Sequence, residues 1–146
     1  MYRTATRMAL LSKIVYDDYD SINSKLLKLG IKDWYWFDNE GTQAILIKTE
    51  KEIIICFRGN EPSQMSDVLS DLKAWPKRSR EKGLVHFGFA QALDRVYDKI
   101  MEQIQRLDMS KIEKTICTGH SLGAALATLM ASRIDAEELY TFGSPR

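Results

Sequence analysis

The chain has 146 residues, of which 45% are hydrophobic, and its 21 basic and 20 acidic side chains leave a formal charge of +1 at pH 7. This balance excludes the strongly basic surface that attracts nucleic acid or anionic membranes. Because the composition is that of a globular protein and no linker rich in proline or serine divides it, residues 1–146 are expected to form one domain.

The N-terminal segment is predicted to be helical. Residues 4–18 place Met8, Leu11 and Ile14 on one face at spacings of three, and helical character is expected to continue until Gly30. Charged residues interrupt the apolar patch of this segment, which is unlike a signal peptide or a membrane span. We therefore expect a soluble protein of the cytoplasm or another intracellular compartment, without a transmembrane segment.

Strands are predicted next. Residues 34–37 are aromatic and residues 38–41 have the composition of a turn, after which residues 43–48 predict a second strand. The apolar run at residues 52–57 has the pattern of a central strand that is covered on both faces. This run contains Cys56, and a similar apolar run contains Cys117. We expect both cysteines to be buried reduced thiols instead of a disulfide or a catalytic thiol.

The rest of the chain alternates between helix and strand. Residues 60–76 carry helically spaced apolar side chains. We then expect a long amphipathic helix, a strand, an Ala-rich helix and a last strand, at residues 87–107, 114–118, 121–134 and 138–142. This order favours an α/β fold with a mostly parallel sheet that helices flank. Two histidines in the whole chain do not suggest a metal site.

The sequence GHSLG at residues 119–123 lies where a predicted strand ends and a helix begins. It fits the nucleophile elbow pattern Gly-x-Ser-x-Gly, a turn that strains the serine backbone and presents the hydroxyl at the carboxyl edge of the sheet. Gly119 and Gly123 are needed because side chains at these two positions would collide. Ser121 is therefore the candidate catalytic nucleophile, and the alternative is that it only caps the helix.

Four segments in fixed order extend this pattern: Phe-Arg-Gly at residues 57–59, Val-His-Phe-Gly-Phe at residues 85–89, the elbow at residues 118–123 and Thr-Phe-Gly-Ser-Pro-Arg at residues 141–146. In order and spacing they resemble the class 3 lipase family, the fungal lipase-like α/β-hydrolases, and the similarity covers essentially the whole chain. The resemblance implies an α/β-hydrolase-type fold that lacks the C-terminal strands.

An ester hydrolase of this fold needs two N–H donors for the oxyanion. The elbow supplies the backbone N–H of Leu122, the residue after the nucleophile. The resemblance places the second donor at Asn60, directly after Phe-Arg-Gly, where the family usually carries serine or threonine. An alternative is that Asn60 only forms a turn before Pro62.

The resemblance also gives residues 63–75 the place of the family's lid, and the alternative is an amphipathic helix that packs on its own core. His86 belongs to a helix-opening motif and is expected to be structural. His120 lies inside the elbow, and its side chain is expected to point away from that of Ser121.

The partners of a catalytic serine are not found in the sequence that follows it. A serine hydroxyl needs an imidazole to accept its proton and a carboxylate to orient that imidazole, in the chain order Ser, Asp, His. Residues 122–146 contain no histidine, and their one aspartate, Asp135, precedes the place of the family's catalytic Asp. We assign neither the triad Asp nor the triad His. A truncated sequence, a half completed by another polypeptide and a remnant kept as a binding module all remain open.

The expected function is therefore a serine carboxylic-ester hydrolase of the lipase type, which acts on a lipid or small ester in lipid metabolism without a metal or organic cofactor. The alternative is a catalytically incomplete hydrolase fold that binds lipid or protein. Acyl transfer to an alcohol and phospholipase A1 specificity are variants of the enzyme hypothesis. Expected partners besides the substrate are a lipid interface and, at the exposed edge of the last strand, a second copy or a complementing C-terminal polypeptide. Nucleic acid is not expected.

Overall fold

The computed structural model describes residues 2–59 and 79–143, and the side chains of residues 3–59 and 88–143. In the described part of the chain the elements follow in this order: α1 (Tyr2–Ile14), α2 (Tyr19–Lys28), β1 (Trp34–Asn39), β2 (Thr42–Lys48), β3 (Glu52–Phe57), α4 (Ser79–Arg106), β4 (Lys114–His120), α5 (Leu122–Ile134) and β5 (Glu138–Phe142). The bounds of β3 and β5 are those expected from the sequence.

The strands of the described residues form one sheet in the order β1-β2-β3-β4-β5. β3, β4 and β5 run parallel, whereas β1 and β2 pair antiparallel with each other and β2 pairs antiparallel with β3. The α/β fold class is confirmed, and the sheet is mixed because short turns join its first strands. Glu40 and Gly41, with φ angles of 50° and 89°, form the connection between β1 and β2. A two-residue turn of this kind can join only antiparallel strands.

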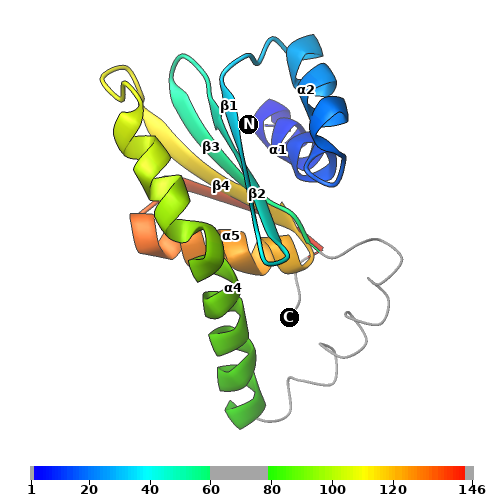
Figure 1. Ribbon diagram of the computed structural model, residues 1–146, viewed down its shortest axis with the longest axis vertical. Coiled ribbons are helices and arrows are strands. Elements are labelled where there is room, and N and C mark those ends of the chain that lie inside the picture. Colours follow the sequence, from blue (N-terminus) through cyan, green and yellow to red (C-terminus); the bar gives the residue numbers. More distant parts are fainter. Residues whose placement is uncertain (1, 60–78, 144–146) are drawn as a thin grey trace.

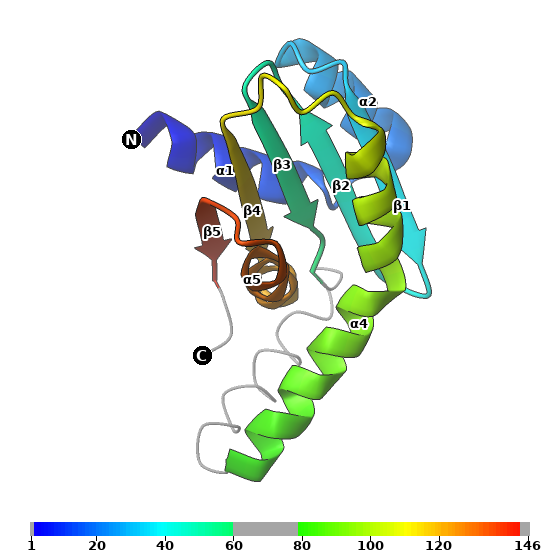
Figure 2. The ribbon, with the colours of Figure 1, turned by 90° about the vertical axis from the view of Figure 1, so that its left-hand side faces the viewer.

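Helices cover both faces of the sheet (Figure 1 and Figure 2): α1 and α2 lie on one face, and α4 and α5 lie on the other. Successive strand residues alternate between two apolar layers, as the strand geometry requires. Ile45 and Ile54 pack with the helices α1 and α2, whereas Leu46 and Ile55 pack with α4 and α5. The sheet therefore contributes to a core on each side.

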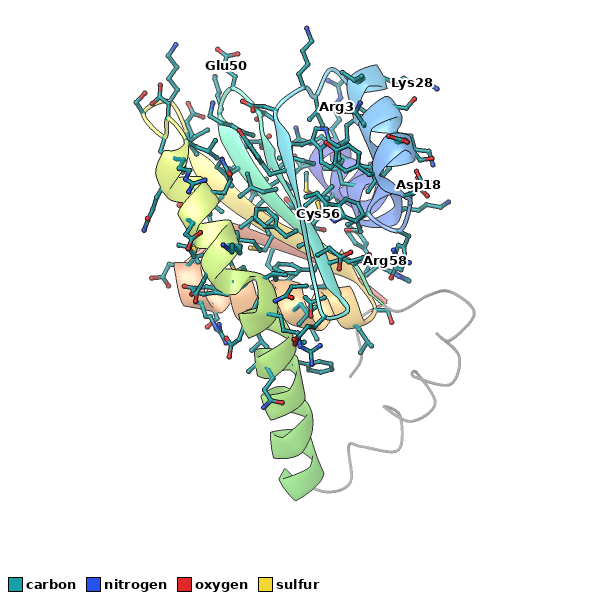
Figure 3. All side chains as sticks on the ribbon, viewed as in Figure 1. Arg3, Asp18, Lys28, Glu50, Cys56 and Arg58 are labelled. Atoms are coloured by element: carbon teal, nitrogen blue, oxygen red, sulfur yellow. The ribbon has the colours of Figure 1, made fainter. Side chains whose placement is uncertain are left out.

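The two cysteines are buried and free, as expected from the sequence. Cys56 faces α1, where Figure 3 shows it in the interior, and Cys117 belongs to the layer beneath α4 and α5. Desolvation raises the pKa of both thiols, that of Cys117 to about 12. Both groups therefore stay protonated at neutral pH and are poor nucleophiles.

The helical segment expected to continue to Gly30 is divided into two helices, α1 and α2. Asp18 has an extended backbone, with ψ 169°, and its side chain accepts a hydrogen bond of 2.9 Å from the Ser21 N–H. This N-cap starts a new helix. The end at Gly30 is confirmed, because φ is 78° there and the Ile31 N–H donates to the Leu26 carbonyl at 2.9 Å.

The long helix α4 begins at Ser79, eight positions before the start expected at Phe87. Residues 80–82 are Arg, Glu and Lys, which favour helix and extend α4 toward its N-terminus. The inward face is as expected, with Leu93 and Ile100 fully buried. No helix of the described residues is long and apolar enough to cross a membrane.

Replacing the N-cap of α2 should destabilise the protein. Asp18→Ala removes the acceptor of the Ser21 N–H, and we expect a loss of about 1 kcal/mol in the free energy of unfolding, measured by urea titration. Asp20→Ala is the matched control, because it removes an equal charge from the first turn of the same helix without removing a cap. Equal losses in the two variants would contradict the capping role.

Candidate active site

The candidate site lies at the carboxyl edge of the parallel strands, where α5 begins. Phe57 at the end of β3 is the register partner of Gly119 in β4, and Phe142 in β5 is the partner of His120. The ends of three parallel strands are thus adjacent. Figure 3 shows Arg58, the residue after β3, at this edge. Ligands of open α/β sheets usually bind at such an edge.

Ser121 occupies the turn between β4 and α5 in a conformation that is rare for a residue with a side chain. Its φ is 58° and its ψ is −122°. Hydrogen bonds hold the backbone on both sides, because the Ser121 N–H donates to the Phe142 carbonyl at 2.9 Å and the Ser121 carbonyl accepts from the Ala124 N–H at 3.0 Å. The side chain makes no capping hydrogen bond to α5, so the alternative of a simple helix cap is wrong.

The two glycines of the motif permit this turn by close backbone contact. A Cβ atom added at Gly119 would lie 2.3 Å from the Gly123 carbonyl oxygen, and one at Gly123 would lie 2.3 Å from the Phe57 carbonyl oxygen. Such distances are far below van der Waals contact. Glycine is therefore required at both positions, because the atoms that a Cβ would meet belong to the backbone and cannot move aside as a flexible side chain can.

The Ser121 hydroxyl is buried and unsatisfied. The residue is 0% exposed, and among the described residues its Oγ has no hydrogen-bond partner. A buried hydroxyl left in this state costs about 1–3 kcal/mol. Such an atom requires an explanation, and a reactive role is one of those known for it.

Leu122 is the first residue of α5. The N–H groups of the first helical turn have no acceptor within the helix, and the helix dipole places partial positive charge there. Leu122 borders a cavity of about 160 Å³ together with Gly59, Phe89 and Leu126. Its backbone N–H thus belongs to a turn suited to an anionic oxygen.

The other positions assigned from the resemblance cannot be compared with the structure. Asn60, residues 63–75 and the side chain of His86 lie outside the described residues. Among the described residues no group of three or more His, Cys, Asp or Glu side chains could hold a metal ion.

His120 makes a contact that the sequence analysis missed. Its Nδ1 is 3.2 Å from the Tyr16 hydroxyl, and the two rings meet edge to face with centroids 6.0 Å apart. A second polar pair lies beside the first, because Ser12 Oγ and Thr118 Oγ1 are 2.9 Å apart in the core. The signal in the sequence was the spacing of Ser12 and Tyr16, two polar groups four residues apart beside an otherwise apolar helix face.

A larger cavity opens beside His120, between α1 and the end of β5. Its volume is about 480 Å³, and two apolar side chains and five with polar groups line it: Ala9, Phe142, Ser12, Lys13, Tyr16, Asp17 and His120. The cavity has the size of a small-ligand site. It lies on the α1 face of the sheet, whereas the cavity at Leu122 lies toward α4.

The family model described as lipase (class 3) matches residues 54–146. The secreted mono- and diacylglycerol lipase LIP1 of Malassezia globosa is 26% identical over an alignment that covers 95% of this chain and 52% of that protein. Among solved structures, a Rhizomucor miehei lipase propeptide complex is similar with a TM-score of 0.64 and 23% identity, over 99% of this chain and 52% of the other.

A lipase from Rhizopus microsporus var. chinensis is similar to the same degree, with a TM-score of 0.65 and 20% identity over 99% of this chain and 57% of that one. At these identities the structural likeness shows the fold. The chain thus spans about half the length of the fungal proteins to which it is similar.

Alanine at the elbow glycines should destabilise the fold, whereas alanine in α4 should not. We expect Gly119→Ala to lower the free energy of unfolding by about 1–3 kcal/mol, because its Cβ would overlap backbone. Gly88→Ala is the matched control, since a Cβ there meets no atom within 4 Å and alanine favours a helix by about 1 kcal/mol. Urea titration measures both, and an unchanged midpoint for Gly119→Ala would contradict the crowding.

Proposed function

Because the chain belongs to the class 3 lipase family, we propose that it hydrolyses carboxylic esters of lipids with Ser121 as the nucleophile. The observation that carries the proposal is the conformation of Ser121. A φ of 58° at the end of a parallel strand, with glycine two residues before and after, is the geometry of a nucleophile elbow. The unpartnered hydroxyl at this position supports the same role.

In the proposed reaction Ser121 Oγ attacks the acyl carbonyl carbon as its proton passes to a base. The carbonyl π electrons move to oxygen, and the N–H groups of Leu122 and Asn60 stabilise the resulting oxyanion. Collapse of this intermediate breaks the bond to the alkoxy oxygen, which takes the proton held by the base and leaves as an alcohol. Water then attacks the acyl-enzyme, releases the carboxylic acid and regenerates Ser121.

The proposed substrates are acylglycerols or related lipid esters. The Malassezia globosa relative is named as a mono- and diacylglycerol lipase. Since Ser121 is buried, substrate access requires an opening step, as lids and loops provide in many enzymes. Contact with a lipid interface would favour opening that exposes apolar surface.

A second candidate function follows from the surroundings of Ser121. Among the described residues its Oγ has no hydrogen-bond partner, and the adjacent His120 contacts the Tyr16 hydroxyl. A hydrolase fold without an imidazole partner for its serine retains only the acceleration from oxyanion stabilisation and binding. Such a protein would bind lipid or protein at the same edge of the sheet without efficient turnover.

A fluorophosphonate probe separates the two candidates. We expect it to label the folded protein, to label Ser121→Ala not at all, and to label Ser132→Ala as well as the parent, since Ser132 is an exposed serine of α5. Intact mass after incubation, with and without detergent micelles, measures the labelling. A folded sample that stays unlabelled in both conditions would favour the binding module.

We also propose that the edge of β5 that no described strand covers pairs with the same edge of a second copy. Among the described strands β5 bonds only to β4, and its Leu139 is 41% exposed. Open edges of this kind recruit strands, and pairing of two identical edges about a twofold axis leaves neither free. A complementing polypeptide is the competing occupant. The intracellular location expected from the sequence stays a prediction.

A charge on this edge should abolish the pairing. We expect the chain to form dimers whose fraction rises with concentration, and Leu139→Lys to shift them to monomers. Leu27→Lys is the matched control, because Leu27 is also exposed but lies on α2. Sedimentation velocity over a concentration series measures the state. A monomer at every concentration would contradict self-pairing and favour a complementing polypeptide.

A further inference from the structure

Tyr16 lies in the turn that follows α1, and its hydroxyl reaches the site at the ends of β3 and β4. Its Oη is 3.2 Å from His120 Nδ1 and 3.4 Å from the His120 carbonyl oxygen. The Gly59 backbone lies beside this hydroxyl, because a Cβ atom added at Gly59 would lie 2.5 Å from Tyr16 Oη. One oxygen atom therefore contacts the segment that leaves β3 and the residue that precedes Ser121.

The contact is too close to tolerate a change in the spacing of these segments. A Cβ added at Gly59 would lie 2.5 Å from Tyr16 Oη and 2.7 Å from the His120 carbonyl oxygen. Nothing larger than glycine fits between the hydroxyl and the elbow. The position of the Gly59 segment is thus set by Tyr16 on one side and by the backbone of β4 on the other.

The fold anchors the hydroxyl by a second contact at the same register. Ser12 and Tyr16 are four residues apart, and Thr118 and His120 are alternate residues on one face of β4. The buried hydroxyl groups of Ser12 and Thr118 are 2.9 Å apart and hold α1 against β4 two residues before His120. Tyr16 is thereby held at the elbow itself.

The donors and acceptors around Tyr16 are consistent with a neutral phenol. Burial raises the pKa of Tyr16 above its ordinary value, although the Gly59 N–H and the Arg58 guanidinium, 5.6 Å from the ring centroid, act in the opposite direction. A hydroxyl has one proton to donate. The Tyr16 proton faces two acceptors on His120, of which Nδ1 at 3.2 Å is nearer than the carbonyl oxygen at 3.4 Å.

We propose that Tyr16 is a positioning residue for the ester hydrolysis proposed above, whose hydroxyl holds the segment leaving β3 at a fixed distance from the turn that carries Ser121 and Leu122. The inference rests on that proposed function. Donors on these two segments stabilise the oxyanion only when their separation matches it, because small displacements of aligned groups reduce rates steeply. Tyr16 contacts no reacting atom and acts through Gly59 and His120.

Tyr16→Phe tests the proposal because it removes the hydroxyl and keeps the ring. We expect the rate of fluorophosphonate labelling, and kcat for a soluble ester, to fall about tenfold to a hundredfold, with KM unchanged within about twofold. Tyr19→Phe is the matched control, since Tyr19 is a tyrosine of α2 that is 56% exposed. Thermal unfolding followed by circular dichroism shows that both variants are folded at the assay temperature.

A readout that does not need activity separates this inference from the proposed function. We expect imidazole nitrogen NMR of the wild-type protein to show His120 with an unprotonated, hydrogen-bonded Nδ1, and this signature to be lost in Tyr16→Phe. Wild-type protein that shows the signature but is not labelled would reject the proposed function, and the positioning role of Tyr16 with it.

Three results would reject the positioning role and leave the proposed function intact. They are labelling of Tyr16→Phe at the wild-type rate, an equal loss of rate in Tyr19→Phe, and a Tyr16→Phe protein that is unfolded at the assay temperature. The last result would show that the hydroxyl is needed for folding, not for the spacing of the site.

Discussion

The arrangement depends on one steric constraint, the contact of backbone with backbone where β3, β4 and α5 meet. Neither Gly119 nor Gly123 has room for a Cβ atom, because carbonyl groups of Gly123 and Phe57 occupy that space. The first turn of α5 therefore lies directly against the end of β3. This closeness brings the strained residue Ser121, the start of a helix and the segment after a neighbouring strand to one point.

The surrounding layers explain how such a turn persists. Ser121 is bonded through its backbone to β5 and to the first turn of α5, while apolar layers on both faces of the sheet hold the strands in place. A positive φ at a non-glycine residue costs of order 1–3 kcal/mol and survives only when its neighbours determine it from several sides. The strain at Ser121 is thus a property of the whole sheet edge and not of five residues.

Much of this could be predicted from the sequence, because the signals were local. The apolar run of β3 and the glycines around Ser121 each depend on residues close in the chain, and they gave correct bounds and a correct turn. The contact of Tyr16 with His120 joins residues 104 positions apart, and the break at Asp18 needed a side chain to compete with an amphipathic pattern that continues past it. Such features depend on tertiary packing that a single sequence does not display.

The hydroxyl pair of Ser12 and Thr118 has a consequence for redesign of the α1 face. Apolar side chains in this layer can exchange for others of equal volume at a small cost, because apolar contacts do not depend on direction. A displacement of α1 along the sheet would leave the hydroxyls of Ser12 and Thr118 without hydrogen-bond partners inside the core. Apolar packing cannot replace the hydrogen bond that is lost. The apolar side chains of this interface can therefore be redesigned, whereas the hydroxyl pair of Ser12 and Thr118 keeps α1 in register with β4.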